Sequence, residues 1–214
     1  CTMSGHNPTA ASISCETAPG FQQGDVLIVS DCSQSAVFQK SNPTNNGTIV
    51  HNTGNVKPGN CTKGLGLPVL CGSTNGTPYE FDPGSSVMQL RAYRFFIANN
   101  DYGEPSLYRQ STLTNAGVLS FAEPIELVEG VENIQILYGE DTDSDKKPNR
   151  YVSAAGVSDF DHVIAVRVSL LIQTNEENLV KGNQSLQFNG AMVNFNDGRL
   201  RKVFTTTIAL RNRL

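Results

Sequence analysis

Four carboxylates lie within the six residues 140–145, which read EDTDSD. Such a density of like charge is electrostatically costly unless water or a cation screens it. Three aspartates of this acidic loop occupy alternate positions, the spacing with which a calcium-binding loop turns carboxylates inward, and further oxygen ligands follow at positions seven and nine of such a loop. The predicted calcium ligands are Asp141, Asp143, Asp145, the carbonyl of Lys147 and the side chain of Asn149.

Other features of the loop favour a solvated acidic hairpin tip that holds no ion. Position six, where a calcium loop has Gly, is Lys146, and position twelve, where it has Glu, is Val152. Lys146 and Lys147 also bring positive charge that can neutralise the carboxylates. The sequence leaves both interpretations open.

A long strand that follows the acidic loop gives the clearest secondary-structure signal. Its apolar residues occupy every second position, with polar residues such as Arg167 and Ser169 between them, so we predict a strand with one buried face. The apolar set is Ile164, Val166, Val168, Leu170 and Ile172. Further apolar residues on the other face predict partial cover there, which places the strand near the middle of a sheet.

Shorter strand signals occur at residues 24–30 and 36–39, in a hairpin formed by residues 87–97 and 106–109, and at residues 201–210. The best helix candidate is the short segment 124–133. The sequence therefore predicts a strongly β-rich fold in which no helix exceeds a turn or two.

The length of 214 residues fits a single domain with a sizeable core. We predict one domain over residues 1–214, in which residues 1–86 are loop-rich and stapled by disulfides. Residues 87–214 form the sheet core, with the acidic loop at 139–151. The net charge of −4 creates no field that would favour nucleic acid or an anionic membrane as the main partner.

All five cysteines lie within the first 71 residues, a segment poor in charge and rich in turn-forming residues. Such a segment needs cross-links, which indicates an oxidising compartment. Pairing four of five cysteines allows about fifteen arrangements, so the sequence does not fix the connectivity. We favour Cys1 with Cys15 and Cys32 with Cys61, and we keep Cys61 with Cys71 as an alternative.

Residues for acid–base or nucleophilic catalysis do not converge in the sequence. The three histidines, His6, His51 and His162, are scattered, and there is no GxSxG or HExxH motif. We therefore predict that the chain is not an enzyme and has no small-molecule substrate.

A basic cluster closes the chain. Its members are Arg199, Arg201, Lys202, Arg211 and Arg213. Such charges can contact DNA phosphates, but Arg201 and Lys202 point to opposite faces of the predicted strand. We favour a solvated edge, or a contact with acidic residues of a neighbouring protein, over DNA.

Five segments resemble the PilW family of type IV pilus minor pilins. In order they are PSLYR (105–109), ELVEGVENIQILYGEDTDSD (126–145), PNRYV (148–152), VIAVRVSLLI (163–172) and RLRKVFTTTIALRNR (199–213). They cover roughly the C-terminal half, whereas the N-terminal half resembles the family only in GDVLIVSDC (24–32). The family often carries Asp-Gly in the acidic loop, so Lys146 is a departure from its pattern.

The resemblance implies a protein made with a leader that a prepilin peptidase cleaves, followed by an apolar helix that anchors it in the inner membrane and packs into the pilus. The sequence has no such apolar stretch and opens on Cys1, so we expect a truncated head domain. Similarity to the J-type pseudopilins of type II secretion implies an α+β pilin-like head with two antiparallel sheets.

The resemblance also implies a periplasmic head that moves to the cell-surface pilus and joins other minor pilins and the major pilin in a complex that primes assembly or caps the fibre. Type IV pili serve twitching motility and DNA uptake, so DNA and host surfaces are further partners to consider. The alternative is a secreted or tip-located adhesin or carbohydrate-binding module that uses the loops at 52–78.

Overall fold

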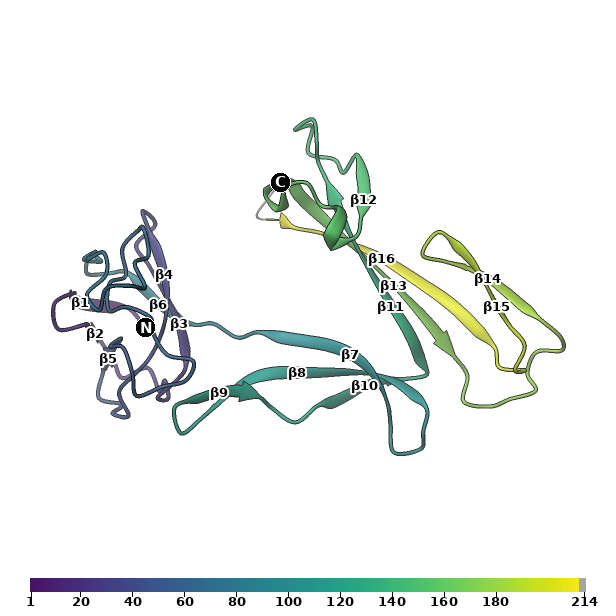
Figure 1. Ribbon diagram of the computed structural model, residues 1–214, viewed down its shortest axis with the longest axis horizontal. Coiled ribbons are helices and arrows are strands. Elements are labelled where there is room, and N and C mark those ends of the chain that lie inside the picture. The colour runs from purple at the N-terminus through teal and green to yellow at the C-terminus, as the bar shows by residue number, and fades with distance from the viewer. Residues whose placement is uncertain (212–214) are drawn as a thin grey trace. The chain divides into compact units, whose positions relative to one another are not determined.

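The computed structural model describes residues 1–211, which form sixteen strands in five antiparallel sheets (Figure 1). The predicted β-rich character is confirmed, although we expected two sheets. The described residues contain no α-helix, only the 3-10 helices η1 (Ala154–Gly156) and η2 (Phe160–His162). No helix in this part of the chain is long and apolar enough to cross a membrane.

The helix predicted at 124–133 is wrong. That segment forms the strand β10 (Ile125–Glu129) and the start of β11 (Val131–Glu140). Gly130 separates the two strands with a φ of 80°, a left-handed conformation that glycine adopts without steric cost. The strands therefore end and restart at this residue, and no helix forms.

The chain divides into two compact units. Unit 1 contains residues 1–94 and 110–124, and unit 2 contains residues 95–109 and the chain from residue 125 onward. The single domain that we predicted, divided near residue 86, stays a prediction.

Unit 1 holds two three-stranded sheets. One has the order β1 (Met3–Asn7), β2 (Ser12–Cys15), β5 (Thr48–Val50), and the other has the order β4 (Ser35–Gln39), β3 (Val26–Ser30), β6 (Ser86–Gln89). The predicted strands at 24–30 and 36–39 form the hairpin β3–β4. The buried core consists of Met3, Ile13, Leu27, Val29, Phe38, Ile49, Leu65, Phe81 and Val87.

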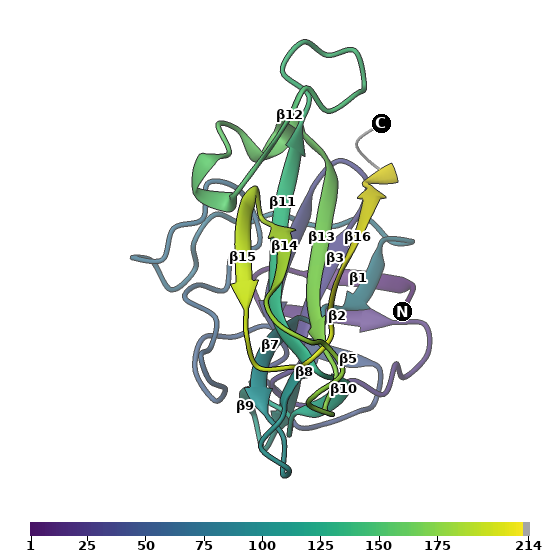
Figure 2. The ribbon, with the colours of Figure 1, turned by 90° about the vertical axis from the view of Figure 1, so that its right-hand side faces the viewer.

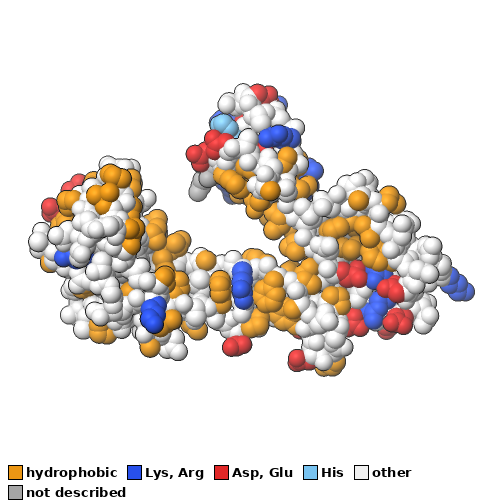
Figure 3. Space-filling view, viewed as in Figure 1, with side chains coloured by type: hydrophobic (Ala, Val, Ile, Leu, Met, Phe, Trp, Pro, Cys, Tyr) orange, Lys and Arg blue, Asp and Glu red, His pale blue; other side chains and the backbone are white. Residues whose placement is uncertain are grey.

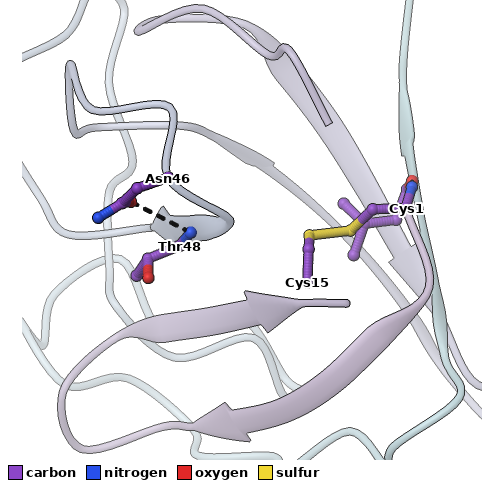
Figure 4. Close-up of a disulfide and its surroundings, with 5 residues drawn as sticks. Cys1, Cys15, Asn46 and Thr48 are labelled. Atoms are coloured by element: carbon purple, nitrogen blue, oxygen red, sulfur yellow. Dashed lines mark hydrogen bonds between the residues drawn. A yellow bond between two sulfur atoms is a disulfide. The ribbon is translucent and has the colours of Figure 1, made fainter. Parts of the chain in front are cut away.

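Two disulfides link parts of unit 1. Cys1 bonds to Cys15 across the first hairpin, as predicted (Figure 4). The pairing of Cys32 with Cys61 is wrong, because Cys61 bonds to Cys71 within one loop, where their Cα atoms are 4.9 Å apart. Cys32 instead lies exposed in the turn between β3 and β4 with a free thiol.

The sheet of β10, β8 (Pro105–Asn115) and β7 (Tyr93–Asn99) has this order, and β9 (Val118–Phe121) pairs with the far end of β8. The strands β7 and β8 correspond to the predicted hairpin. Residues 87–89, which we predicted as the start of this hairpin, instead belong to β6, which pairs with β3.

The main sheet of unit 2 has the order β12 (Arg150–Val152), β11, β13 (Val163–Gln173), β16 (Arg201–Ala209). Figure 2 shows β11, β13 and β16 side by side. A separate hairpin consists of β14 (Gln184–Phe188) and β15 (Ala191–Phe195). The alternating strand predicted after the acidic loop is β13, and its place inside the sheet is confirmed.

We expect alkylation of the native, unreduced protein to label Cys32 alone, because the other four cysteines are bonded. Peptide mass mapping should then recover the Cys1–Cys15 and Cys61–Cys71 bridges. Label on Cys71, or a peptide that joins Cys32 to Cys61, would contradict this connectivity.

Candidate functional site

The acidic loop connects β11 to β12, and the structure brings its three aspartates together. The carboxylate oxygens of Asp141, Asp143 and Asp145 lie within 4.8 Å of one another. Oxygens that share one calcium ion lie at most about 5 Å apart, because each Ca–O distance is about 2.4 Å. The spacing in the sequence therefore predicted the proximity of these carboxylates, and their geometry fits a calcium ion.

Backbone hydrogen bonds shape the loop around Asp141. Its Oδ1 accepts from the N–H of Ser144 at 2.7 Å, and its Oδ2 accepts from the N–H of Lys146 at 2.8 Å. Lys146 adopts a φ of 66°, the conformation that Gly supplies at this position of a calcium loop. The departure from Gly therefore changes the residue type but leaves the left-handed backbone in place.

The side chain of Asn149, one of the predicted ligands, makes contacts within the loop, whereas the predicted role of the Lys147 carbonyl stays a prediction. The side-chain Oδ1 of Asn149 accepts from the N–H of Thr142 at 2.6 Å, and its amide nitrogen donates to Asp143. The ammonium of Lys147 lies 3.8 Å from a carboxylate oxygen of Asp145. The side chains of Asn149 and Lys147 thus bond to other residues of the same loop, as expected for a hairpin tip that holds no ion.

Glu140 differs from the other carboxylates of the acidic stretch because it is fully buried. Its Oε1 accepts from the N–H and the hydroxyl of Ser158, at 2.8 and 2.6 Å, and Arg150 pairs with its Oε2 at 2.8 Å. The hydroxyl and N–H of Ser158 lower the pKa of Glu140 to about 2, and Arg150 adds to this. Glu140 therefore anchors the loop to β12 and to the segment before η2, and it is not part of a cation site.

The sheet of β11, β13 and β16 carries an apolar face made of three rows of paired residues. The rows are Ile134, Leu170 and Phe204; Ile136, Val168 and Thr206; and Tyr138, Val166 and Ile208. Ile136 is 40% exposed, Phe204 49% and Ile208 52%. Figure 3 shows hydrophobic side chains gathered along this sheet.

The prediction that β13 buries this face is wrong. Val166, Val168, Leu170 and Ile172 are only partly buried, whereas the buried residues of β13 are Val163, Ile164, Ala165 and Leu171. The opposite face of the sheet carries polar side chains beside the apolar Leu137, Leu171 and Val203, and Leu171 is buried there, as the predicted partial cover of this face requires. Ser169 and Thr205 share a hydrogen bond of 2.8 Å, and the guanidinium of Arg167 lies 3.5 Å above the ring of Tyr151.

The basic cluster is only in part the solvated edge that we predicted, because Lys202 and Arg211 are exposed whereas Arg199 and Arg201 are paired within the chain. The guanidinium of Arg199 donates to both carboxylate oxygens of Glu104, at 2.7 and 3.0 Å. Arg201 is buried and pairs with Glu132 and Asp197 at 2.7 and 2.6 Å. Two of the five basic residues are thus paired with carboxylates of the same chain. Arg213 lies outside the described residues.

Two of the histidines are neighbours in the fold, which the sequence analysis missed. The Nε2 atoms of His6 and His51 are 3.1 Å apart, both side chains are buried, and burial lowers both pKa values, that of His51 to about 4. The N–H of Phe81 donates to Nδ1 of His6, so neutral His6 carries its proton on Nε2 and donates to His51. A metal ion at these Nε2 atoms would require that proton to leave. The third histidine, His162, is exposed.

Unit 2 is thus a β-rich unit with a partly exposed apolar sheet face and an acidic loop. The family model for the type IV pilus-assembly protein W matches residues 94–212, more than half of the chain. The chain belongs to this PilW family. The GDVLIVSDC segment of the resemblance lies outside the matched residues. No curated protein and no solved structure matches this chain.

Because the pKa of Glu140 falls from 4.5 to about 2 on folding, its ionised form contributes stability above pH 4.5, and this contribution is lost as the pH falls toward 2. We expect Glu140→Gln to lower the melting temperature at neutral pH and to match the wild type near pH 2. Circular dichroism melts across this range test the convergence.

The matched control is Asp145→Asn, which removes an exposed charge from the same loop and should change the melting temperature little. A difference between wild type and Glu140→Gln that stays constant from neutral pH to pH 2 would show that the carboxylate has no such role.

Proposed function

We propose that this chain is the head of a minor pilin that helps prime type IV pilus assembly, and can cap the fibre, through contacts with other minor pilins and the major pilin. Membership of the PilW family supports a role in pilus assembly. The observation that carries the finer proposal is the apolar face of the β11–β13–β16 sheet, because a sheet with one apolar face needs a second layer over it.

We further propose that an apolar helix supplies this layer and completes a pilin-like α+β head. Such a helix would hold the protein in the inner membrane with its head in the periplasm before assembly, and within the cell-surface pilus afterwards. The half-exposed Ile136, Phe204 and Ile208 are the side chains that it would cover. On the opposite face Arg167, Ser169 and Thr205 interrupt the apolar residues, so that face offers a helix a less continuous apolar surface.

The contacts of the histidines and arginines support a role without catalysis or DNA binding at the last strand. His6 and His51 are buried against each other, so neither is accessible as a general base. Arg199 and Arg201 bind carboxylates of their own chain, so contacting phosphates would require them to break these pairs. We keep the proposals that the chain is no enzyme and has no small-molecule substrate.

Calcium is the ligand that we propose for the acidic loop, on the basis of the three converging carboxylates. Calcium should raise the melting temperature of the wild type, and Asp143→Ala should remove this increase, because it deletes one ligand. Glu176→Ala, an exposed carboxylate elsewhere in unit 2, is the control and should keep the increase. Equal melting curves for the wild type with calcium and with chelator would exclude the ion.

The assembly role predicts that the chain co-purifies with other minor pilins and that its deletion reduces piliation. In the full-length protein, Ile136→Asp should lower the number of pili, because it puts a charge on the apolar face. Gln135→Asp is the matched control, since Gln135 is adjacent in β11 but lies on the opposite face of the sheet. Failure to form any complex, with undiminished piliation in the deletion strain, would overturn the assembly role.

A further inference from the structure

A groove of about 450 Å³ lies in unit 1, between β4 and the loop of residues 58–69. Just before β4, the amide of Gln34 donates to the carbonyl of Leu65, a residue that lines this β4 groove, at 2.8 Å. At the other end of β4 the side chain of Asn60 lies against Gln39. The groove follows the length of β4, which is an edge strand of its sheet.

The contacts of Asn60 show which way the backbone of β4 points. The N–H of Gln39 donates to Oδ1 of Asn60 at 2.7 Å, and the amide of Asn60 donates to the carbonyl of Gln39 at 2.8 Å. Asn60 therefore bonds this strand residue from the outer side, as a neighbouring strand would. Backbone groups two residues apart in a strand point the same way, so the N–H and C=O of Val37 also face the groove.

Within the described part of the chain, these two groups of Val37 make no hydrogen bond on the groove side. Edge strands of natural proteins are normally protected by charged side chains, prolines or bulges. The strand β4 has the sequence SAVFQ and carries none of these, and its pairing with β3 is regular. The edge is thus open to one more strand at Val37.

The walls of the groove indicate what such a strand would carry. Val37, Leu67 and Val69 are each more than half exposed, and the Cys61–Cys71 disulfide holds the loop that presents the last two. No residue that lines the groove is charged. A charged group placed there would lose water and find no opposite charge, so the groove fits an uncharged, apolar segment.

We propose that the β4 groove binds an extended, uncharged segment of a partner protein, which adds to β4 as a strand. The segment offers an acceptor to the N–H of Val37 and a donor to its C=O, and its apolar side chains pack on Leu67 and Val69. Backbone pairing supplies affinity in this mode of recognition, and the side-chain pockets supply specificity. The inference stands on unit 1 and does not depend on the pilus-assembly role.

The test uses the whole chain, labelled for NMR, and a defined mixture of acetylated and amidated pentapeptides. Their first, third and fifth residues are Val, Ile or Leu, and the second and fourth are Ser or Thr. We expect saturable shifts of the Val37 amide and of the Leu67 and Val69 methyl groups, with slower hydrogen exchange at Val37. The same mixture N-methylated at all five residues keeps no main-chain N–H to donate from its residues, so it should bind at least about tenfold more weakly.

Two variants localise the binding. Val37→Pro removes the outward N–H, and an edge strand tolerates proline when that N–H points away from the sheet. Val37→Thr keeps the N–H and is its matched control. Leu67→Asp puts a charge on the opposite wall without touching β4. Val37→Pro and Leu67→Asp should each weaken binding at least about tenfold, with otherwise unchanged amide spectra, whereas Val37→Thr should bind like the wild type.

Several results would overturn the proposal. They are the absence of any saturable shift, equal binding of the N-methylated mixture, and binding that neither Val37→Pro nor Leu67→Asp weakens. Neutral trisaccharides that shift the same signals while the peptides do not would identify a carbohydrate site instead. Shifts at Val37 that depend on protein concentration without peptide would identify a second copy of the chain as the occupant.

Discussion

Unit 2 depends on one buried cation, the guanidinium of Arg201. It makes two hydrogen bonds to Glu132 in β11, two to Asp197 in the turn before β16, and one to Gln173 at the end of β13. The ring of Phe195 in β15 lies 4.0 Å from its carbon Cζ. Because a buried charge without partners costs several kcal/mol, these segments gain stability only when they assemble together. The pairing of Arg201 with Asp197 in turn lowers the pKa of that carboxyl.

This charged cluster fixes one end of the sheet, and strand alternation determines which side chains share a face along its length. The register fixed by the pairing of Gln173 with Arg201 places Leu170, Val168 and Val166 together on one face of β13, so the apolar side chains of three strands line up. Glu140 fixes the other end of β11 through Ser158 and Arg150. Between these two buried charges the sheet presents a regular, partly exposed apolar surface.

The sequence predicted what local periodicity determines. The alternation in β13 predicted a strand inside a sheet, and the spacing of Asp141, Asp143 and Asp145 predicted converging carboxylates. Burial of the strand could not be predicted, because alternation shows that a face is apolar and does not show what covers it. Arg199 pairs with Glu104 and Arg201 with Glu132, which lie 95 and 69 positions away in the sequence. The basic cluster was recognised from residues close together in the sequence, so these distant partners could not be predicted.

Other predictions differ from the structure where the same local sequence is compatible with two structures. A glycine with positive φ allowed residues 124–133 to continue as two strands, although their composition is also compatible with a helix. Cys61 bonds to Cys71, ten residues away, because closing a short loop costs little conformational entropy. Glu140 looked like one more member of an acidic stretch, and only its position at the buried end of β11 separates it from its neighbours.

The burial of His6 and His51 makes the stability of unit 1 depend on pH. The folded unit 1 keeps both imidazoles neutral below their usual pKa, whereas the unfolded chain takes up protons near pH 6.5, so falling pH favours unfolding of this unit from about pH 6.5 down to about 4. The carboxylate that anchors unit 2 titrates lower still. As the pH falls, unit 1 therefore loses the stability that its neutral histidines contribute before unit 2 loses the contribution of Glu140.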